Sequence, residues 1–237
     1  MAGVTEPKEV KLHGAWGSAH SAMARNALAL KGVRYEYVEE DLDNKSETLL
    51  RLNPVHGKVP VLVVDGRPLS ESLVIIEYVD GAWHGREPAL LPREPRERAA
   101  ARFWARFFHD RVSPLSHPVV FAAGEAERAE LVREMKERMA VLEAGIREDF
   151  PYGSEGPFVH GRRPGLLDVI LGSCAAGIRL LSALSGEEIV EPGTLPRVHA
   201  SVTAFDELAN GFRTTVPHEL LLARLLERKA RPRAAAA

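Results

Sequence analysis

Cysteine is almost absent from this chain, which contains only Cys174 among its 237 residues. One cysteine cannot form an intramolecular disulfide, and it cannot supply the cysteine pairs of a structural zinc site. Proteins without disulfides are typical of the reducing cytoplasm. We therefore expect a cytoplasmic protein with no bound metal.

The chain also lacks an excess of charge of either sign. It has 31 lysines and arginines against 33 aspartates and glutamates, which gives a net charge of −2. Proteins that bind nucleic acids need an excess of basic residues to neutralise phosphates. We therefore expect no nucleic-acid partner.

Long hydrophobic runs are missing as well. The most apolar stretch, residues 166–184, contains Asp168 and Arg179 and falls short of the ~20 apolar residues that a membrane span needs. The first residues lack the apolar segment of a secretory signal peptide. These absences predict a soluble, unprocessed chain with no membrane partner.

Several motifs of common enzymes are absent. The sequence contains no GxGxxG or phosphate-binding loop, no HExxH and no GxSxG. Ser18 and His20 are a possible nucleophile and base, but residues two apart at a helix start do not face each other. With no third residue to orient the histidine, a serine hydrolase is disfavoured.

The N-terminal part alternates between strand and helix patterns, and 45% of the chain is hydrophobic, enough for a sizeable core. Strands are predicted at residues 10–14, 35–39, 59–64 and 67–70, and helices at residues 18–30, 46–52 and 72–78. Asp65-Gly66 is a strong hairpin turn between the last two strands. The pattern predicts a βαβαββα domain over residues 8–84.

Beyond residue 84 the pattern becomes helical. Residues 85–95 contain three prolines and read as a linker. Apolar residues then recur at helical spacing over residues 96–111, 125–148, 166–184, 195–210 and 217–229. We expect an all-helical second domain over residues 96–230.

Four ordered motifs in the first domain carry a family resemblance. They are WGS at residues 16–18, EEDLDNKS at 39–46, NPVHGKVPVL at 53–62 and ESLVIIEY at 71–78. Together they resemble the plant tau-class glutathione transferases, closely over residues 9–83 and more loosely at 102–105 and 165–168. The resemblance implies a thioredoxin-like domain followed by an α-helical domain, as the patterns also predict, and a homodimer.

The chemistry of this family requires a thiolate. A free thiol with a pKa of ~8.5 is only a few per cent ionised at pH 7, so the protein must stabilise the anion. A hydroxyl at a helix N-terminus provides both a hydrogen bond and the positive end of the helix dipole. The resemblance implies that Ser18 is the catalytic serine, although a serine in such a place is also an ordinary helix cap.

The resemblance also implies a glutathione-binding site. Lys45 and Lys58 would bind the glycyl carboxylate, the backbone of Val59 the cysteinyl main chain, and Glu71 with Ser72 the γ-glutamyl end. The peptide bond before Pro60 would be cis. Taken alone, each lysine is equally typical of a solvated surface charge, and Ser72 of a helix cap.

The electrophile site is implied by position in the family pattern and consists of His20, Phe107 and Arg111. The chain has Ser18-Ala19-His20 where the family commonly has Ser-Pro-Phe. Near a thiolate, the imidazolium form of His20 would be favoured. In the second domain, Asp168 is expected to have a structural role and Cys174 to be buried and unreactive.

These expectations define a glutathione transferase of the serine type that conjugates glutathione, as co-substrate, to hydrophobic electrophiles in detoxification or secondary metabolism. No metal or organic cofactor is expected. Two alternatives remain open: a carrier that binds hydrophobic ligands without chemistry, and glutathione-dependent reduction of hydroperoxides.

Overall fold

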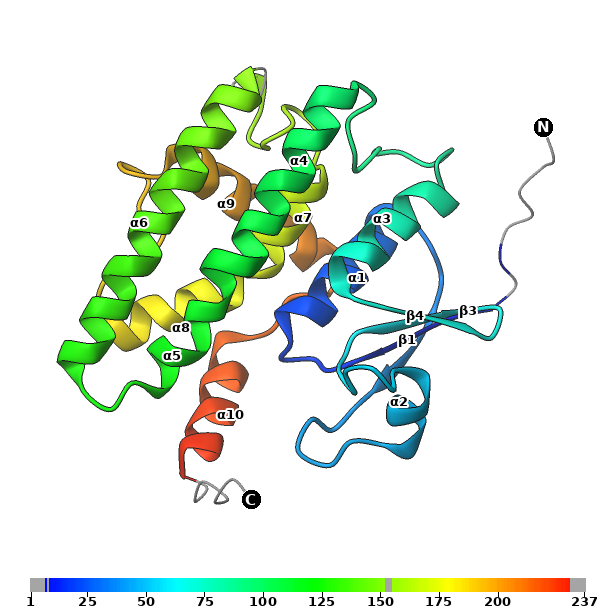
Figure 1. Ribbon diagram of the computed structural model, residues 1–237, viewed down its shortest axis with the longest axis horizontal. Helices are drawn as coiled ribbons and strands as arrows, with labels where there is room; N and C mark the ends of the chain where they lie inside the picture. Colours follow the sequence, from blue (N-terminus) through cyan, green and yellow to red (C-terminus); the bar gives the residue numbers. More distant parts are fainter. Residues whose placement is uncertain (1–6, 8, 152–154, 231–237) are drawn as a thin grey trace.

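A computed structural model of the chain describes residue 7, residues 9–151 and residues 155–230. Figure 1 shows two parts: a sheet with its helices, formed by the N-terminal segment, and a group of long helices formed by the rest. The last helix, α10 (His218–Ala230), lies at the boundary between these two parts.

The first part has the predicted βαβαββα order. Its elements are β1 (Val10–Gly14), α1 (Ala19–Leu30), β2 (Glu36–Glu39), α2 (Glu47–Leu52), β3 (Val61–Val64), β4 (Arg67–Ser70) and α3 (Ser72–Ala82). The strands lie in the order β2-β1-β3-β4. β1 is parallel to β2 and antiparallel to β3, which pairs antiparallel with β4.

The burial of β3 explains how helices cover both faces of this sheet. All four of its residues are buried, and alternate residues of a strand face opposite sides. Leu62 and Val64 belong to the large core that includes α1 and α3, whereas Val61 and Val63 pack with Leu49 of α2. The predicted strand at residues 59–64 is therefore correct only from Val61 onward.

The second part is helical, as predicted, but its boundaries differ from the sequence pattern. Its helices are α4 (Pro95–Phe107), α5 (Ser116–Phe121), α6 (Glu125–Asp149), α7 (Leu166–Ser173), α8 (Ala175–Ser185), α9 (Pro196–Gly211) and α10. After Phe107 the chain continues as a π-helical turn, η1 (Phe108–Val112), and a short 3₁₀ turn, η2 (Ser113–Leu115). The helix α5 had no predicted counterpart.

The single helix predicted over residues 166–184 is wrong, because α7 and α8 meet at a bend of 42°. The hydroxyl of Ser173 donates to the carbonyl of Val169 at 2.6 Å, a bond that competes with the helix ladder and bends helices. Within residues 9–151 and 155–230, no single helix is long and apolar enough to cross a membrane, and α7 with α8 passes that test only as this bent pair.

A buried ion pair ties the end of α1 to α3 and to the segment between the two parts. The side chain of Lys31 is fully buried, and its Nζ lies 2.7 Å from Oδ1 of Asp80. Nζ also donates to the carbonyl of Arg86 at 2.8 Å. The Asp80 carboxylate accepts from the backbone N–H groups of Leu90 and Leu91. The pair therefore fixes the chain path that leads into the helical part.

We expect Lys31→Met to lower the free energy of unfolding by about 3 kcal/mol, because removing one partner leaves a largely buried carboxylate without its countercharge. Denaturation by urea measures the effect. The double variant Lys31→Met with Asp80→Asn should recover part of the loss.

Lys11→Met is the matched control, because Lys11 pairs with Glu9 and Glu36 in solvent and its loss should cause no measurable change. A loss below about 1 kcal/mol in Lys31→Met, within the range of surface ion pairs, would contradict the structural role given to Lys31.

Candidate functional site

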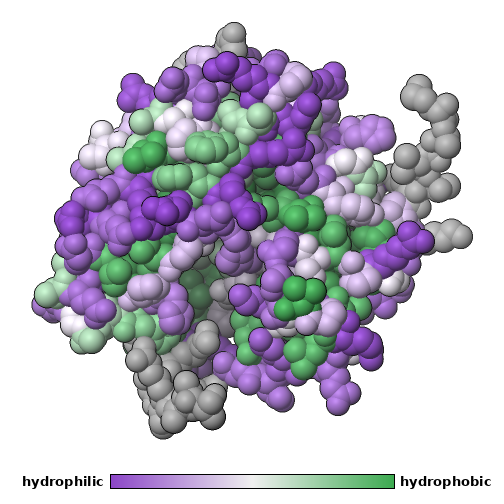
Figure 2. All heavy atoms as spheres, in the orientation of Figure 1, coloured by the Kyte–Doolittle hydropathy of each residue, from purple (hydrophilic) through white to green (hydrophobic). Residues whose placement is uncertain are grey.

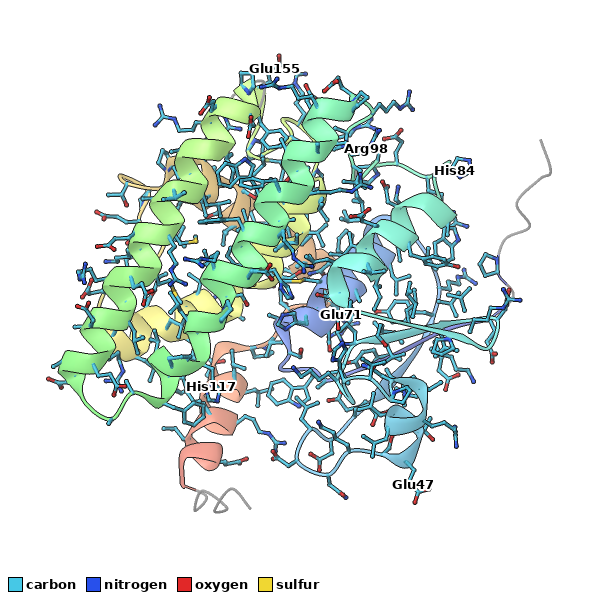
Figure 3. The ribbon with its side chains drawn as sticks, viewed as in Figure 1. Glu47, Glu71, His84, Arg98, His117 and Glu155 are labelled. Carbon is cyan, nitrogen blue, oxygen red and sulfur yellow. The ribbon has the colours of Figure 1, made fainter. Side chains whose placement is uncertain are left out.

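A cavity of about 950 Å³ lies between the sheet part and the helical part. The sheet part lines it with the N-terminal end of α1, the loop at residues 53–60 and the start of α3. The helical part lines it with residues from the segment 106–117, from α6 and from α8. In Figure 3, Glu71 lies where the two parts meet. Six segments, several of them far apart in the sequence, thus converge on one space.

Ser18 is the N-cap of α1, and its side chain lines the cavity. Its Oγ accepts a hydrogen bond from the N–H of Ser21 at 3.3 Å. Among the residues that the structure describes, nothing accepts the hydrogen of this hydroxyl. The preceding loop is held by Ala15 N–H donating to Ser21 Oγ and Trp16 N–H donating to Glu39. The hydroxyl is therefore fixed at the positive end of a 12-residue helix with its own proton free to donate.

Asn53 organises the loop that follows α2. Its buried side chain donates from Nδ2 to the carbonyl of Lys58 at 2.9 Å and accepts from the N–H of His56. The peptide bond between Val59 and Pro60 is cis, as the resemblance implied. In the described part of the chain, neither the N–H nor the carbonyl of Val59 has a hydrogen-bond partner. The loop therefore offers the Val59 backbone to the cavity.

Glu71 and Ser72 begin α3 beside this loop. Glu71 has a φ of 75°, in the left-handed region that residues other than glycine rarely adopt. Its carboxylate lies 3.5 Å from Nε2 of His56. The hydroxyl of Ser72 is buried and has no hydrogen-bond partner in the described structure. A buried polar group without a partner is costly, so the Ser72 hydroxyl indicates a place for a ligand.

Lys45 and Lys58 have different positions. Lys58 lines the cavity with an exposed side chain. Lys45 is exposed in the loop before α2 and is not part of the cavity wall. Of the two expected carboxylate-binding lysines, the structure brings only Lys58 to the site.

Phe107 and Arg111 do not line the cavity; Phe108, His109 and Val112 line it instead. Phe107 packs edge to face against Trp104, with ring centroids 5.6 Å apart. Phe107 lies in α4, and for Arg111 the reason is the π-helical turn at Phe108–Val112. Such a turn contains an extra residue, so it rotates the side chains after Phe107 relative to a continuous α-helix.

His20 lies in the first turn of α1 and lines the cavity as expected. Its ring meets the ring of His109 edge to face, with centroids 5.5 Å apart. Burial lowers the pKa of His20, and the charges of His109 and Lys58 lower it further against the opposing effect of Glu71. Burial thus favours the neutral imidazole, and the imidazolium form expected for His20 beside a thiolate stays a prediction.

Asp168 and Cys174 belong to the helical wall. The fully buried carboxylate of Asp168 accepts hydrogen bonds from the N–H groups of Val159 and Gly165 and from the hydroxyl of Ser201. This network fits the structural role expected for Asp168. Cys174 is half-buried on the cavity wall, not fully buried as expected, and desolvation of its thiol raises its pKa to about 12. No group of three or more potential metal ligands occurs among the described residues.

Sequence reasoning missed two contributors to this site. The first is Asn53, whose position before a proline in NPVHGKVPVL is typical of a side chain that bonds to its own turn. The second is His109, whose ring bonds to the adjacent Asp110. Helical periodicity does not predict contacts between neighbours in the chain, so this pair was missed. Both residues line the cavity.

Comparisons with known proteins agree with this geometry. Residues 8–81 match the family described as glutathione S-transferase, N-terminal domain. Glutathione S-transferase U10 of Arabidopsis thaliana is 39% identical over 214 residues, which are 90% of this chain and 90% of that protein.

Two solved structures are also similar. The tau-class glutathione S-transferase of mango, Mangifera indica, has a TM-score of 0.83 at 33% identity, covering 93% of this chain and 99% of that one. Rice GST1, solved in complex with glutathione, has a TM-score of 0.82 at 33% identity, covering 94% and 99%.

The raised pKa of Cys174 leads to a test of the cavity wall. At about pH 8 a thiol with a pKa of about 12 is ionised roughly a thousandfold less than an ordinary cysteine. We therefore expect the folded protein to react with iodoacetamide far more slowly than the urea-unfolded chain, as followed by mass spectrometry. Equal labelling rates in both states would show that the folded structure does not raise the pKa of this thiol.

Proposed function

The chain belongs to the glutathione S-transferase family and to its tau class, and from this premise we propose that it ionises the thiol of glutathione at Ser18 and adds it to hydrophobic electrophiles. The observation that carries the proposal is the free hydroxyl proton of Ser18 at the N-terminus of α1, on the wall of the cavity. The family relationship supports the conjugation reaction, and this hydroxyl supports the serine-type mechanism.

The free energies are sufficient for thiol activation. Lowering a thiol pKa by two units requires about 2.7 kcal/mol of preference for the anion. A hydrogen bond to a charged group contributes about 1.5–3 kcal/mol, and a helix N-terminus about 0.3–1 kcal/mol. The Ser18 hydroxyl and the α1 terminus together therefore account for a thiolate at neutral pH without any other group.

The rest of glutathione finds partners along the same wall. We assign the γ-glutamyl end to Glu71 and Ser72, where a carboxylate faces an ammonium group and the unpartnered Ser72 hydroxyl meets the ligand carboxylate at the start of α3. The free backbone of Val59 pairs with the cysteinyl peptide unit as an added strand would. Lys58 provides the charge for the glycyl carboxylate. Lys45 is proposed only as a distant contributor of positive charge, because it lies outside the cavity wall.

The remaining cavity suits a hydrophobic electrophile. Phe108, Val112, Met139, Ile178 and Leu181 line it on the helical side. A site of this composition favours apolar compounds and fits a role in detoxification. We propose a cytoplasmic location, on the grounds that the chain has a single cysteine and so no intramolecular disulfide. The proposed reaction needs no cofactor beyond glutathione itself.

Ser18→Ala should lower kcat/KM for chlorodinitrobenzene at neutral pH by on the order of 10- to 100-fold, in proportion to the lost 1.5–3 kcal/mol. The rate should recover as the pH rises, because alkali ionises the thiol without the hydroxyl. Glutathione affinity, measured by calorimetry, should change by less than about threefold.

Lys58→Ala is the contrasting variant, since its charge contacts the glycyl end and not the sulfur. We expect weaker glutathione binding by roughly 1–3 kcal/mol with little change in the pH profile of kcat. If Ser18→Ala retained full activity at neutral pH, the assignment of Ser18 would be wrong. If glutathione did not bind to the unmodified protein, the transferase function itself would fail.

We propose that two copies of the chain pair through α3 and α4. Val74 and Tyr78 of α3 are 49% and 39% exposed, and Phe103 of α4 is 59% exposed. The two helices are joined at this place by the ion pair of Glu77 with Arg102. Figure 2 shows hydrophobic residues gathered over α3 on this face. An exposed apolar patch of this kind is typical of a protein interface.

Phe103→Glu should shift the protein from dimer to monomer at micromolar concentration, because it places a charge in the desolvated centre of the interface. Analytical ultracentrifugation measures the change. Val141→Glu on α6 replaces another exposed apolar residue, 51% exposed, and should leave the mass unchanged. A dimer that survives Phe103→Glu would place the interface elsewhere.

A further inference from the structure

Two histidines from different parts of the fold meet inside the cavity. The His20 and His109 rings are in edge-to-face contact and both line the wall. His20 follows Ser18 by two residues in the first turn of α1. The pair therefore borders the space that an electrophile must occupy to reach a thiolate at Ser18.

The two imidazoles differ in their partners. Nδ1 of His109 lies 3.1 Å from Oδ1 of Asp110, whose other oxygen accepts from Nε of Arg106 at 2.8 Å. The hydrogen bond with His109 and the charge of Arg106 lower the pKa of Asp110, which is therefore ionised at neutral pH. An ionised carboxylate only accepts hydrogen bonds, so Nδ1 of His109 carries a proton. No described residue bonds to the ring of His20.

This arrangement leaves Nε2 of His109 as the nitrogen that exchanges protons with the cavity. Asp110 fixes the tautomer and the orientation of the ring, and no described residue occupies Nε2. A histidine with one nitrogen held by a carboxylate and the other facing a binding site has the geometry of a general acid or base. His20 lacks such a partner and provides packing for the His109 ring.

We propose that His109 is a catalytic general acid for the addition of glutathione to α,β-unsaturated carbonyl compounds, and that Asp110 is its positioning residue. The proposal rests on the proposed function, since it requires a thiolate at Ser18. The class of electrophile proposed for this cavity is therefore the α,β-unsaturated carbonyl compounds.

The reaction balances with the groups already named. The thiolate sulfur forms a bond to the β-carbon, the carbon–carbon π bond breaks, and its electron pair moves to give an enolate with negative charge on the carbonyl oxygen. Nε2–H of His109 donates its proton to that oxygen, and the enol then becomes the ketone. The proton released when the next glutathione thiol ionises returns to Nε2. Glutathione is thus added with no other reactant.

Substitution on an aryl halide has a different requirement. There the leaving chloride is a weak base and needs no proton, so a general acid contributes little. The helical wall combines apolar side chains with the donors Ser113, Ser116, His117 and His109, and among the described residues His109 is the one of these whose ring a carboxylate orients. His109 is therefore expected to matter for addition far more than for substitution.

The charged and titratable groups around His109 come from three elements. Arg106 and Asp110 lie on its own helical segment, and His20 lies on α1. On α6, Arg138 bonds to Glu134 and to the carbonyl of Arg111. Only Asp110 bonds directly to the His109 ring among the described residues, so removal of its charge is the direct test of positioning.

The test compares two electrophiles, benzylideneacetone as the unsaturated ketone and chlorodinitrobenzene as the aryl halide, at saturating glutathione. His109→Gln should lower the ratio of the ketone kcat to the aryl-halide kcat by about 100-fold, and Asp110→Asn by about tenfold. Added imidazole should restore part of the ketone rate in His109→Ala.

A pH profile separates acid catalysis from a structural role. A general acid must be protonated, so the ketone rate of the unmodified protein should fall with rising pH relative to the aryl-halide rate, which needs no acid. In His109→Gln this alkaline fall should disappear.

Equal losses for both electrophiles, or no rescue by imidazole, would overturn the role of His109. Turnover of chlorodinitrobenzene without turnover of the ketone by the unmodified protein would overturn this inference alone, and turnover of neither would overturn the proposed function.

Discussion

The position of α1 is the constraint on which the site depends. The C-terminal end of this helix is held by the buried pair of Lys31 with Asp80. Its middle is held by Asn26, which donates to Ser173 of α7 at 2.9 Å and accepts from Thr214 at 2.5 Å. Its N-terminal end carries Ser18 into the cavity. Because the helix is anchored to both parts of the fold, the hydroxyl and the opposite cavity wall keep a defined separation.

The two parts that α1 joins contribute different kinds of side chain to the cavity. The sheet part supplies polar groups with free hydrogen-bonding capacity: the Ser18 hydroxyl, the Val59 backbone and the buried Ser72 hydroxyl. The helical part supplies a largely apolar wall with a few polar side chains, among them His109, which is held by a carboxylate. For the proposed reaction, glutathione and an apolar electrophile would therefore have separate surfaces that meet near the end of α1.

Much of this organisation is readable from the sequence. Period-two and period-3.6 patterns predict the βαβαββα order, and the Asp65-Gly66 hairpin and the helix start after Ser18 follow from local chemistry. The break at Ser173 was not predictable, because a serine bonds to the carbonyl four residues earlier only in some helices, and the close packing of Gly172, where a Cβ would lie 2.3 Å from the Phe205 ring, is a tertiary contact. Which side chains after Phe107 point toward the cavity depends on the π-helical turn η1. Such features arise from tertiary packing, which a local pattern does not contain.

The central claim is that the end of α1 converts glutathione to its thiolate, and the ultraviolet absorbance of the thiolate measures this directly. Titration of glutathione bound to the unmodified protein should give a midpoint about two pH units below that of the free thiol, as the hydroxyl and the helix terminus together allow. A midpoint equal to that of free glutathione would contradict the account, because the hydroxyl of Ser18 would then have no effect on the sulfur.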